Sequence, residues 1–67
     1  MNAKELKVEM IRNNDTGIEL AKALGISRIA FSKKINLKTQ FTRNEILAIK
    51  ERYNLSAERV MEIFFAD

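Results

Sequence analysis

The sequence of 67 residues contains no cysteine, no histidine, no proline and no tryptophan. Without cysteine there are no disulfides and no thiol chemistry, and the lack of both cysteine and histidine excludes most zinc sites and the usual general base of enzymes. An enzyme would have to use carboxylates, lysines or the one tyrosine, and these residues are not spaced for catalysis. We therefore expect no enzymatic activity, no metal and no cofactor.

Long apolar segments are also missing. No apolar run approaches the roughly 20 residues that a membrane-spanning helix needs, and the N-terminal MNAKELKVEM lacks the apolar centre of a signal peptide. Hydrophobic residues nevertheless make up 46% of the chain, which favours a folded core over disorder. We expect one soluble, cytoplasmic domain over residues 1–67, near the lower size limit for a core without disulfides or metals.

Helix breakers are scarce because the chain has no proline and only two glycines, so helix ends must be located from capping residues. A first helix has Leu6 and Met10 on its apolar face and ends at the polar residues 13–15. A second helix begins at the capping box Thr16-Gly17-Ile18-Glu19, in which the Thr and Glu side chains each accept a hydrogen bond from the other residue's amide. It stops at Gly25, a residue type that readily takes the left-handed conformation of a helix end.

Three more helices are predicted. Ser27 caps a third helix, about Arg28–Ile35, after a connection of only three residues that makes the second and third helices cross steeply. The loop 36–41 follows, a second capping box at Thr42 to Glu45 opens a fourth helix, and Ser56 caps a fifth. The predicted fold is an all-α, compact five-helix bundle with a helix-turn-helix. In the last two helices the predicted core positions are Ile46, Ile49, Tyr53, Ala57, Val60, Met61 and Phe64.

Acidic residues are absent from residues 20–44, LAKALGISRIAFSKKINLKTQFTRN. This segment holds six of the 12 basic residues and none of the nine acids. The six are Lys22, Arg28, Lys33, Lys34, Lys38 and Arg43. Concentrated positive charge of this kind is typical of nucleic-acid-binding surfaces. Lys22 or Lys34 taken alone is equally compatible with an ordinary solvated helix face.

The third helix has a face suited to a DNA groove. If Phe31 and Ile35 point to the core, the opposite face presents an arginine, an isoleucine, a serine and a lysine. Arginine and lysine bind guanine, serine bonds to several base edges, and isoleucine contacts the thymine methyl group. The predicted base contacts are Arg28, Ile29, Ser32 and Lys33. For Ile29, loose packing on the helix remains an equal alternative.

The segment TGIELAKALGISRIAFSKKIN resembles the helix-turn-helix of the phage Cro and repressor family. Ala21 stands at the small position where the two helices touch, and Gly25 stands at the turn. The apolar positions of the family are matched by Leu20, Leu24, Ile26 and Phe31. The resemblance implies a DNA-binding transcriptional regulator, with the same four residues of the third helix as base contacts.

The sequence departs from the family pattern at five positions. Gly17 stands where many members have a phosphate-binding Gln, and Leu37 replaces the usual Gly after the recognition helix. Lys34 stands at a family position that is apolar. Met10 and Ile35 stand where several members have an Arg–Glu ion pair, so we expect an apolar contact there.

Residues on both sides of the third helix are predicted to contact phosphates. The Thr16 hydroxyl and the Gly17 amide form an anion site at a helix N-terminus. Similar proteins lay the loop after the third helix along the DNA backbone, which implies contacts from the loop and from the start of the fourth helix. The full set is Thr16, Gly17, Asn36, Lys38, Gln40 and Arg43. Such contacts set the register and the salt dependence of binding.

The C-terminal MEIFFAD predicts a dimer interface, because helical spacing that buries Phe64 leaves Ile63 and Phe65 as an exposed apolar pair. A two-fold homodimer would place its recognition helices roughly 34 Å apart and bind a palindromic operator on double-stranded DNA. Its mechanism would be repression by operator occupancy. Two alternatives stay open: Phe65 folds back over the first helix, or the chain is a protein-interaction module, such as an antirepressor or antitoxin-like partner, that uses Ile63 and Phe65.

Overall fold

Each helix begins at a residue whose side chain accepts a hydrogen bond from an amide of the first turn. The computed structural model describes residues 1–66. Its elements are α1 (Ala3–Arg12), α2 (Gly17–Leu24), α3 (Arg28–Ile35), α4 (Arg43–Arg52) and α5 (Ala57–Phe64), and no strand occurs among the described residues. Four of the five caps, at Thr16, Ser27, Thr42 and Ser56, are those predicted, and Asn2 is the fifth. The all-α, five-helix prediction is confirmed.

The two predicted capping boxes differ. At α4 both hydrogen bonds form, from the Glu45 amide to Thr42 Oγ1 at 3.2 Å and from the Thr42 amide to Glu45 Oε1 at 2.8 Å. At α2 only the first forms, from the Glu19 amide to Thr16 Oγ1 at 3.1 Å. The Thr16 amide does not donate to the Glu19 carboxylate, so the second half of that predicted box was wrong.

Four helices end in the same way, with one residue in the left-handed conformation. These residues are Asn14, Gly25, Leu37 and Asn54, with φ of 51°, 70°, 65° and 52°. After α3, for example, the Leu37 amide donates to the Lys34 carbonyl at 3.1 Å and the Lys38 amide donates to the Lys33 carbonyl at 2.8 Å, which is the Schellman pattern. The loop after α3 therefore keeps the usual path although leucine, which adopts this conformation at a cost of about 1 kcal/mol, replaces glycine.

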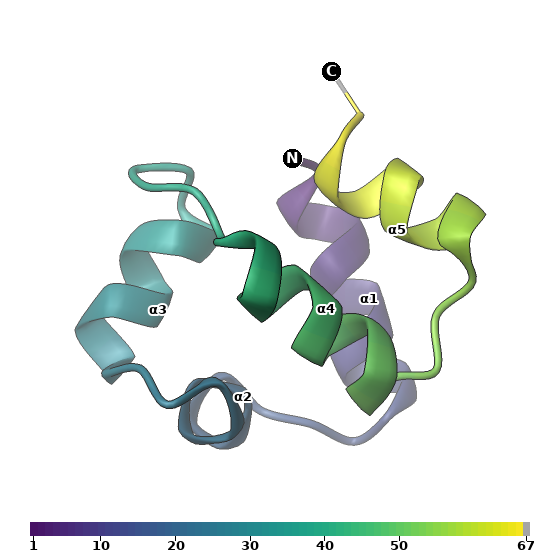
Figure 1. The fold of residues 1–67 in the computed structure, drawn as a ribbon. Helices are drawn as coiled ribbons and strands as arrows, with labels where there is room; N and C mark the ends of the chain where they lie inside the picture. Colours follow the sequence, from purple (N-terminus) through teal and green to yellow (C-terminus); the bar gives the residue numbers. More distant parts are fainter. Residues whose placement is uncertain (67) are drawn as a thin grey trace.

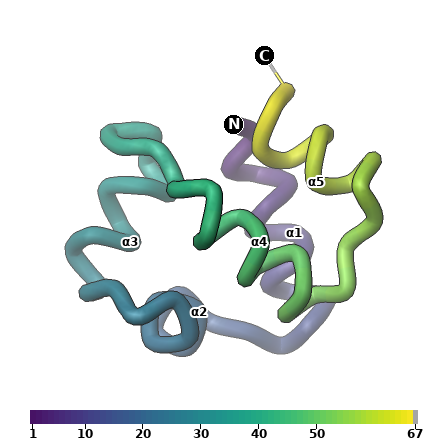
Figure 2. Tube along the Cα trace, in the orientation of Figure 1, coloured from purple at the N-terminus to yellow at the C-terminus, as the bar shows by residue number. Residues whose placement is uncertain are grey.

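The helices form two pairs joined by α4. The steep pair α2 and α3 lies at the left and bottom of Figure 1, and α1 and α5 lie together with the two chain ends at the other side. The tube in Figure 2 shows the same closeness of the termini, where the Asn2 amide donates to the Ile63 carbonyl at 2.6 Å. Because α4 contacts both α2 and α5, it fixes the pairs relative to one another.

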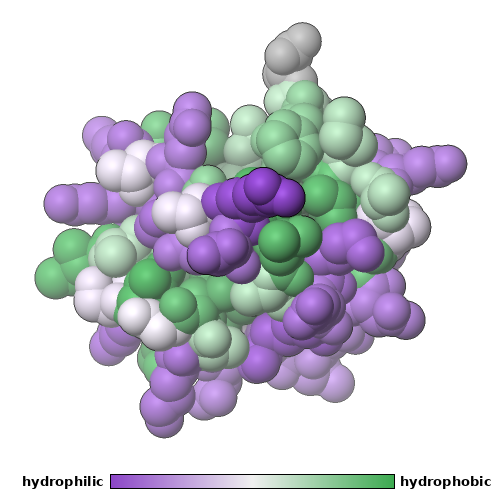
Figure 3. All heavy atoms as spheres, viewed as in Figure 1, coloured by the Kyte–Doolittle hydropathy of each residue, from purple (hydrophilic) through white to green (hydrophobic). Residues whose placement is uncertain are grey.

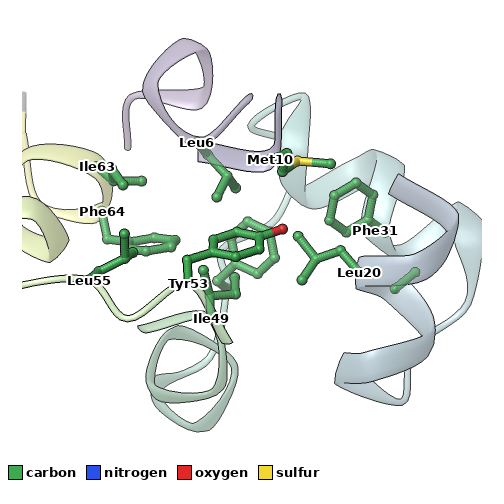
Figure 4. Packing of buried hydrophobic residues seen from close by; sticks show 11 residues of the cluster. Leu6, Met10, Leu20, Phe31, Ile49, Tyr53, Leu55, Ile63 and Phe64 are labelled. Carbon is green, nitrogen blue, oxygen red and sulfur yellow. The ribbon is translucent and has the colours of Figure 1, made fainter. Parts of the chain in front are cut away.

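The core draws on all five helices and on the loop before α4 (Figure 4). Its buried residues are Leu6, Met10, Leu20, Ala21, Phe31, Phe41, Ile49, Tyr53, Leu55, Ile63 and Phe64. Phe41 joins distant parts of it, because its ring packs edge to face on Phe31, at 6.2 Å between centroids, and on Phe64, at 5.9 Å. Met10 is buried and Ile35 half-buried, so both belong to the apolar interior.

The predicted core face of α5 is confirmed in part, since Phe64 is buried and Val60 half-buried as predicted. Ile63 is fully buried, whereas Met61, expected in the core, is 58% exposed, and Ala57 is exposed as well. Arg59, one turn earlier, pairs with Glu5 and Glu9 of α1 at 2.8 and 2.7 Å, so the face of α5 that carries Arg59 and Ile63 lies against α1. Ile63 is therefore not available as a dimer contact.

Within residues 1–66, no helix has the length and apolar character required to cross a membrane.

Candidate nucleic-acid interface

The outward face of α3 carries the four residues predicted to contact bases. Arg28, Ile29, Ser32 and Lys33 are all exposed, while Phe31 on the opposite side is buried. Ile29 is 71% exposed, which is compatible with a base contact and with loose packing on the helix alike. Over α3, at the left of Figure 3, hydrophilic and apolar side chains are mixed, as a face that meets both polar base edges and methyl groups requires.

Ser32 is held by its neighbour one turn later. The Asn36 side-chain amide donates to Ser32 Oγ at 3.2 Å. This bond occupies one acceptor site of the hydroxyl and leaves its proton free to donate outward. Asn36, predicted as a phosphate contact, thus also orients a predicted base contact, because both residues lie on the exposed side of the same helix end.

The N-terminus of α2 lies beside the N-terminus of α3. A shallow hollow is lined by Thr16, Gly17, Ile18, Arg28 and Phe31. The Thr16 hydroxyl accepts from the Glu19 amide at 3.1 Å, which again leaves a hydroxyl proton to donate. The hollow therefore brings together a helix N-terminus, a hydroxyl and an arginine, three groups that favour an anion.

Gly17 allows α2 to approach the Phe31 ring of α3 closely. A Cβ atom at residue 17 would lie 3.2 Å from Cε2 of Phe31, tighter than an ordinary contact. The Phe31 ring has little room to move because it packs against Phe41. A larger residue at position 17 would therefore require the Phe31 ring to shift by a few tenths of an ångström.

The remaining predicted phosphate contacts lie at the C-terminal end of α3. Lys38 and Gln40 are exposed in the loop, and Arg43 is exposed in the first turn of α4, which begins beside that loop (Figure 1). The predicted contacts therefore fall into two groups, one at each end of α3, with the predicted base contacts between them. This is the order expected for a helix lying in a groove between two phosphate backbones.

Most cations of the acid-free segment have no acidic partner. Among residues 1–66, ion pairs involve only one of its six cations, Lys34, which bonds to Glu45 at 2.9 Å. The five without an ion pair are Lys22, Arg28, Lys33, Lys38 and Arg43. All five are exposed, so their charges face solvent and are available to a polyanion.

Asp15, immediately before α2, is a residue that sequence analysis missed. It accepts from Arg52 Nε at 2.7 Å and from the Tyr53 hydroxyl at 2.5 Å, both at the end of α4. The hydrogen bond from Arg52 is the largest influence and, together with Tyr53, holds the pKa of Asp15 below its usual value despite burial of the side chain. This pair anchors the start of α2, and a partner 37 positions away along the chain leaves no local pattern.

Only one of the two predicted dimer contacts is exposed. Phe65 is 59% exposed and lines an open groove with Met1, Leu37, Ile46 and Phe64. It does not fold back into the core, whereas Ile63 does. An exposed apolar surface therefore exists at the C-terminal end, but it contains Phe65 without Ile63.

A scan of the sequence against protein-family models, a search of curated proteins and a search of solved structures each find no match.

Proposed function

We propose that the chain is a sequence-specific double-stranded DNA-binding protein that regulates transcription, of the phage Cro or repressor type. The observation that carries the proposal is the exposed face of α3. It combines Arg28, Ile29, Ser32 and Lys33 without an acid and lies between two groups of cations and phosphate-binding donors. A solvated helix face does not require this distribution, because solubility is served equally well by mixed charges.

In the proposed mechanism α3 enters the major groove and reads base edges. The Arg28 guanidinium bonds to guanine O6 and N7, Lys33 to a second guanine, and Ile29 packs on a thymine methyl group. Thr16 and Gly17 bind the phosphate backbone at one end of α3, and Lys38 and Arg43 bind it at the other. Occupancy of the operator excludes polymerase or a competing regulator, and a DNA-bound protein of this kind acts in the cytoplasm.

A homodimer completes the proposal. Eight residues of one α3 cover only a few base pairs, and a second copy related by two-fold symmetry would double the contacts and require a palindromic operator. Because Ile63 is buried, Phe65 and the groove beside it replace the predicted Ile63 and Phe65 pair as the surface available for that contact.

The test is selection of bound sites from random duplex DNA, followed by a salt series on the selected duplex. We expect palindromic sites with half-sites spaced about one DNA turn, or roughly 34 Å, apart. Affinity should fall steeply with salt, because each phosphate neutralised by a cation releases about one counterion.

The series includes a shuffled duplex of equal length as its control. Binding of both duplexes with equal affinity would contradict sequence-specific regulation. Absence of binding even at low salt would overturn the whole proposal and favour the interaction module that uses Phe65.

A further inference from the structure

Lys34 is the cation of the acid-free segment that does not face solvent. Its side chain is 12% exposed, and Nζ donates to Glu45 Oε1 at 2.9 Å and to the Gln40 carbonyl at 3.1 Å. The ammonium also lies 5.8 Å from the centroid of the Phe41 ring, within the range of a cation–π contact. A single side chain of α3 therefore contacts the end of the loop, a core aromatic ring and the first turn of α4.

The acceptor of Lys34 is itself the carboxylate of a capping box. Glu45 Oε1 accepts from the Thr42 amide at 2.8 Å and from Lys34 Nζ at 2.9 Å. Burial alone would raise the pKa of Glu45, but these two donors outweigh it and hold the pKa below its ordinary value of 4.5. The carboxylate thus stays charged at neutral pH and ties the start of α4 to the end of α3.

The segment spanned by this contact is the one that carries the proposed backbone contacts. Loop residues 36–42 are bounded by α3 at one end, where Lys34 is anchored, and by Thr42 at the other. Lys38 and Gln40 lie between these anchors, and Arg43 follows directly after them. The Lys34 contacts with Gln40 and Glu45 therefore set the distance between this segment and α3.

We propose that Lys34 is a positioning residue that fixes loop 36–42 and the start of α4 against α3, so that Lys38 and Arg43 reach the backbone of the duplex whose bases α3 reads. This role rests on the proposed function. The sequence alone is compatible with a solvated Lys34 or with a Lys34 that contacts DNA directly. The positioning role differs from both. The charge acts inside the protein, and its effect on DNA passes through other residues.

The first experiment measures amide hydrogen exchange in the free protein, with Lys34→Met and Glu45→Gln. Glutamine keeps an oxygen that accepts from the Thr42 amide but removes the ion pair. We expect exchange at the Lys38 and Thr42 amides to rise about fivefold or more in both variants, with the Tyr53 amide unchanged. A uniform rise at all protected amides would show a global loss of stability and overturn the positioning role.

The second experiment is a double-mutant cycle on duplex DNA that combines Lys34→Met with Lys38→Ala. Lys38→Ala should lower the salt slope by about one unit in the unaltered chain and by half of that or less in the Lys34→Met background. Lys22→Met is the matched control, because Lys22 is an exposed lysine that forms no ion pair with any of the residues 1–66. In that background the effect of Lys38→Ala should be unchanged.

The outcomes separate this role from the proposed function. Equal effects of Lys38→Ala in the Lys34→Met background and in the unaltered chain would overturn the positioning role while DNA binding stands. If the unaltered chain binds no duplex at low salt, the proposed function fails, and with it the effect of Lys34 on the DNA contacts of Lys38 and Arg43. The exchange experiment still decides whether Lys34 holds the loop in the free protein.

Discussion

Arginines are used differently in the two halves of this molecule. In the half built from α1, α5 and the end of α4, Arg12, Arg52 and Arg59 all form ion pairs. In the half built from α2, α3 and the following loop, up to the first turn of α4, Arg28 and Arg43 have no acidic partner within residues 1–66. Arg59 thus joins α5 to α1, Arg52 joins α4 to the start of α2 and Arg12 pairs within α1, whereas Arg28 and Arg43 face solvent.

The difference follows from where the acids lie. Glu9 is buried on α1 and receives Arg59 from α5 at 2.7 Å, so the ion pair joins two helices that are distant in sequence. The acid-free segment 20–44 offers no such partner within itself. Where one of its cations is paired, as Lys34 is, the acid comes from Glu45, just beyond the segment. The absence of acids from a segment therefore predicts unpaired, solvent-facing cations only where no acidic residue of a neighbouring element contacts them.

The largest effect expected from this comparison is on stability. Arg59→Met should lower the free energy of unfolding by about 2–3 kcal/mol, because it leaves the buried Glu9 carboxylate with only the exposed Arg12 as a partner. Arg28→Met, the same change in the other half, should alter it by about 0.5 kcal/mol or less. Urea denaturation of the two variants measures the contrast.

A second change checks the cause. Adding Glu9→Gln to Arg59→Met removes the uncompensated charge and should recover part of the lost stability. Equal destabilisation by Arg59→Met and Arg28→Met would mean that the two halves do not differ in how they use arginine.

A smaller effect is expected within the unpaired half, where base contacts and backbone contacts should behave differently. Arg28→Ala should relax sequence choice at one base position, at a cost of about 1–3 kcal/mol for the preferred base. Lys38→Ala should weaken binding to all sequences about equally and lower the salt slope by roughly one unit. Binding to a panel of single-base variants of the selected site measures both.

The matched control lies at the far end of α4. Lys50 forms no ion pair among the described residues and stands in the last turn, near the connection to α5. Lys50→Ala should leave the salt slope unchanged. Identical behaviour of Arg28→Ala and Lys38→Ala would show that the residues around α3 are sorted wrongly into base and backbone contacts.

The smallest effect concerns the loop after α3, which carries the second group of predicted phosphate contacts. Leu37→Gly should raise the free energy of unfolding by about 0.5–1 kcal/mol, because leucine is strained at a φ of 65° and glycine is not. Asn14→Gly, at a φ of 51°, is the control and should change stability less, since asparagine tolerates the left-handed conformation. Thermal denaturation compares them, and a loss of stability in Leu37→Gly would mean that its exposed side chain contributes packing in the groove beside Phe65.

Local chemistry made the helix boundaries predictable. The predicted bounds of the third helix, 28–35, are those of α3, because Ser27 supplies a cap whose hydrogen bond spans only three residues. The turn at Gly25 was predictable for the same reason, since its conformation is a property of one residue. The candidate face of α3 followed from this helix and its period, and each of its four residues is exposed.

Spacing could not determine the rotation of α5. Its last turns contain Met61, Ile63 and Phe64, so more than one face is apolar and several rotations satisfy the pattern. The rotation is defined only once α5 packs on α1, where Ile63 is fully buried and Arg59 pairs with Glu5 and Glu9, 54 and 50 positions away. The predicted dimer pair failed for this reason, and only Phe65 of the two is exposed.

The sequence by itself determined where four of the five helices start and that one segment concentrates positive charge, because caps and composition act over a few residues. The tertiary structure alone decided which of those charged side chains face solvent and which one is paired. It buried Lys34 against Glu45, placed Arg28 in a hollow with the start of α2, and turned Ile63 inward. These outcomes depend on contacts between side chains far apart along the chain, and their geometry exists only once the helices have packed.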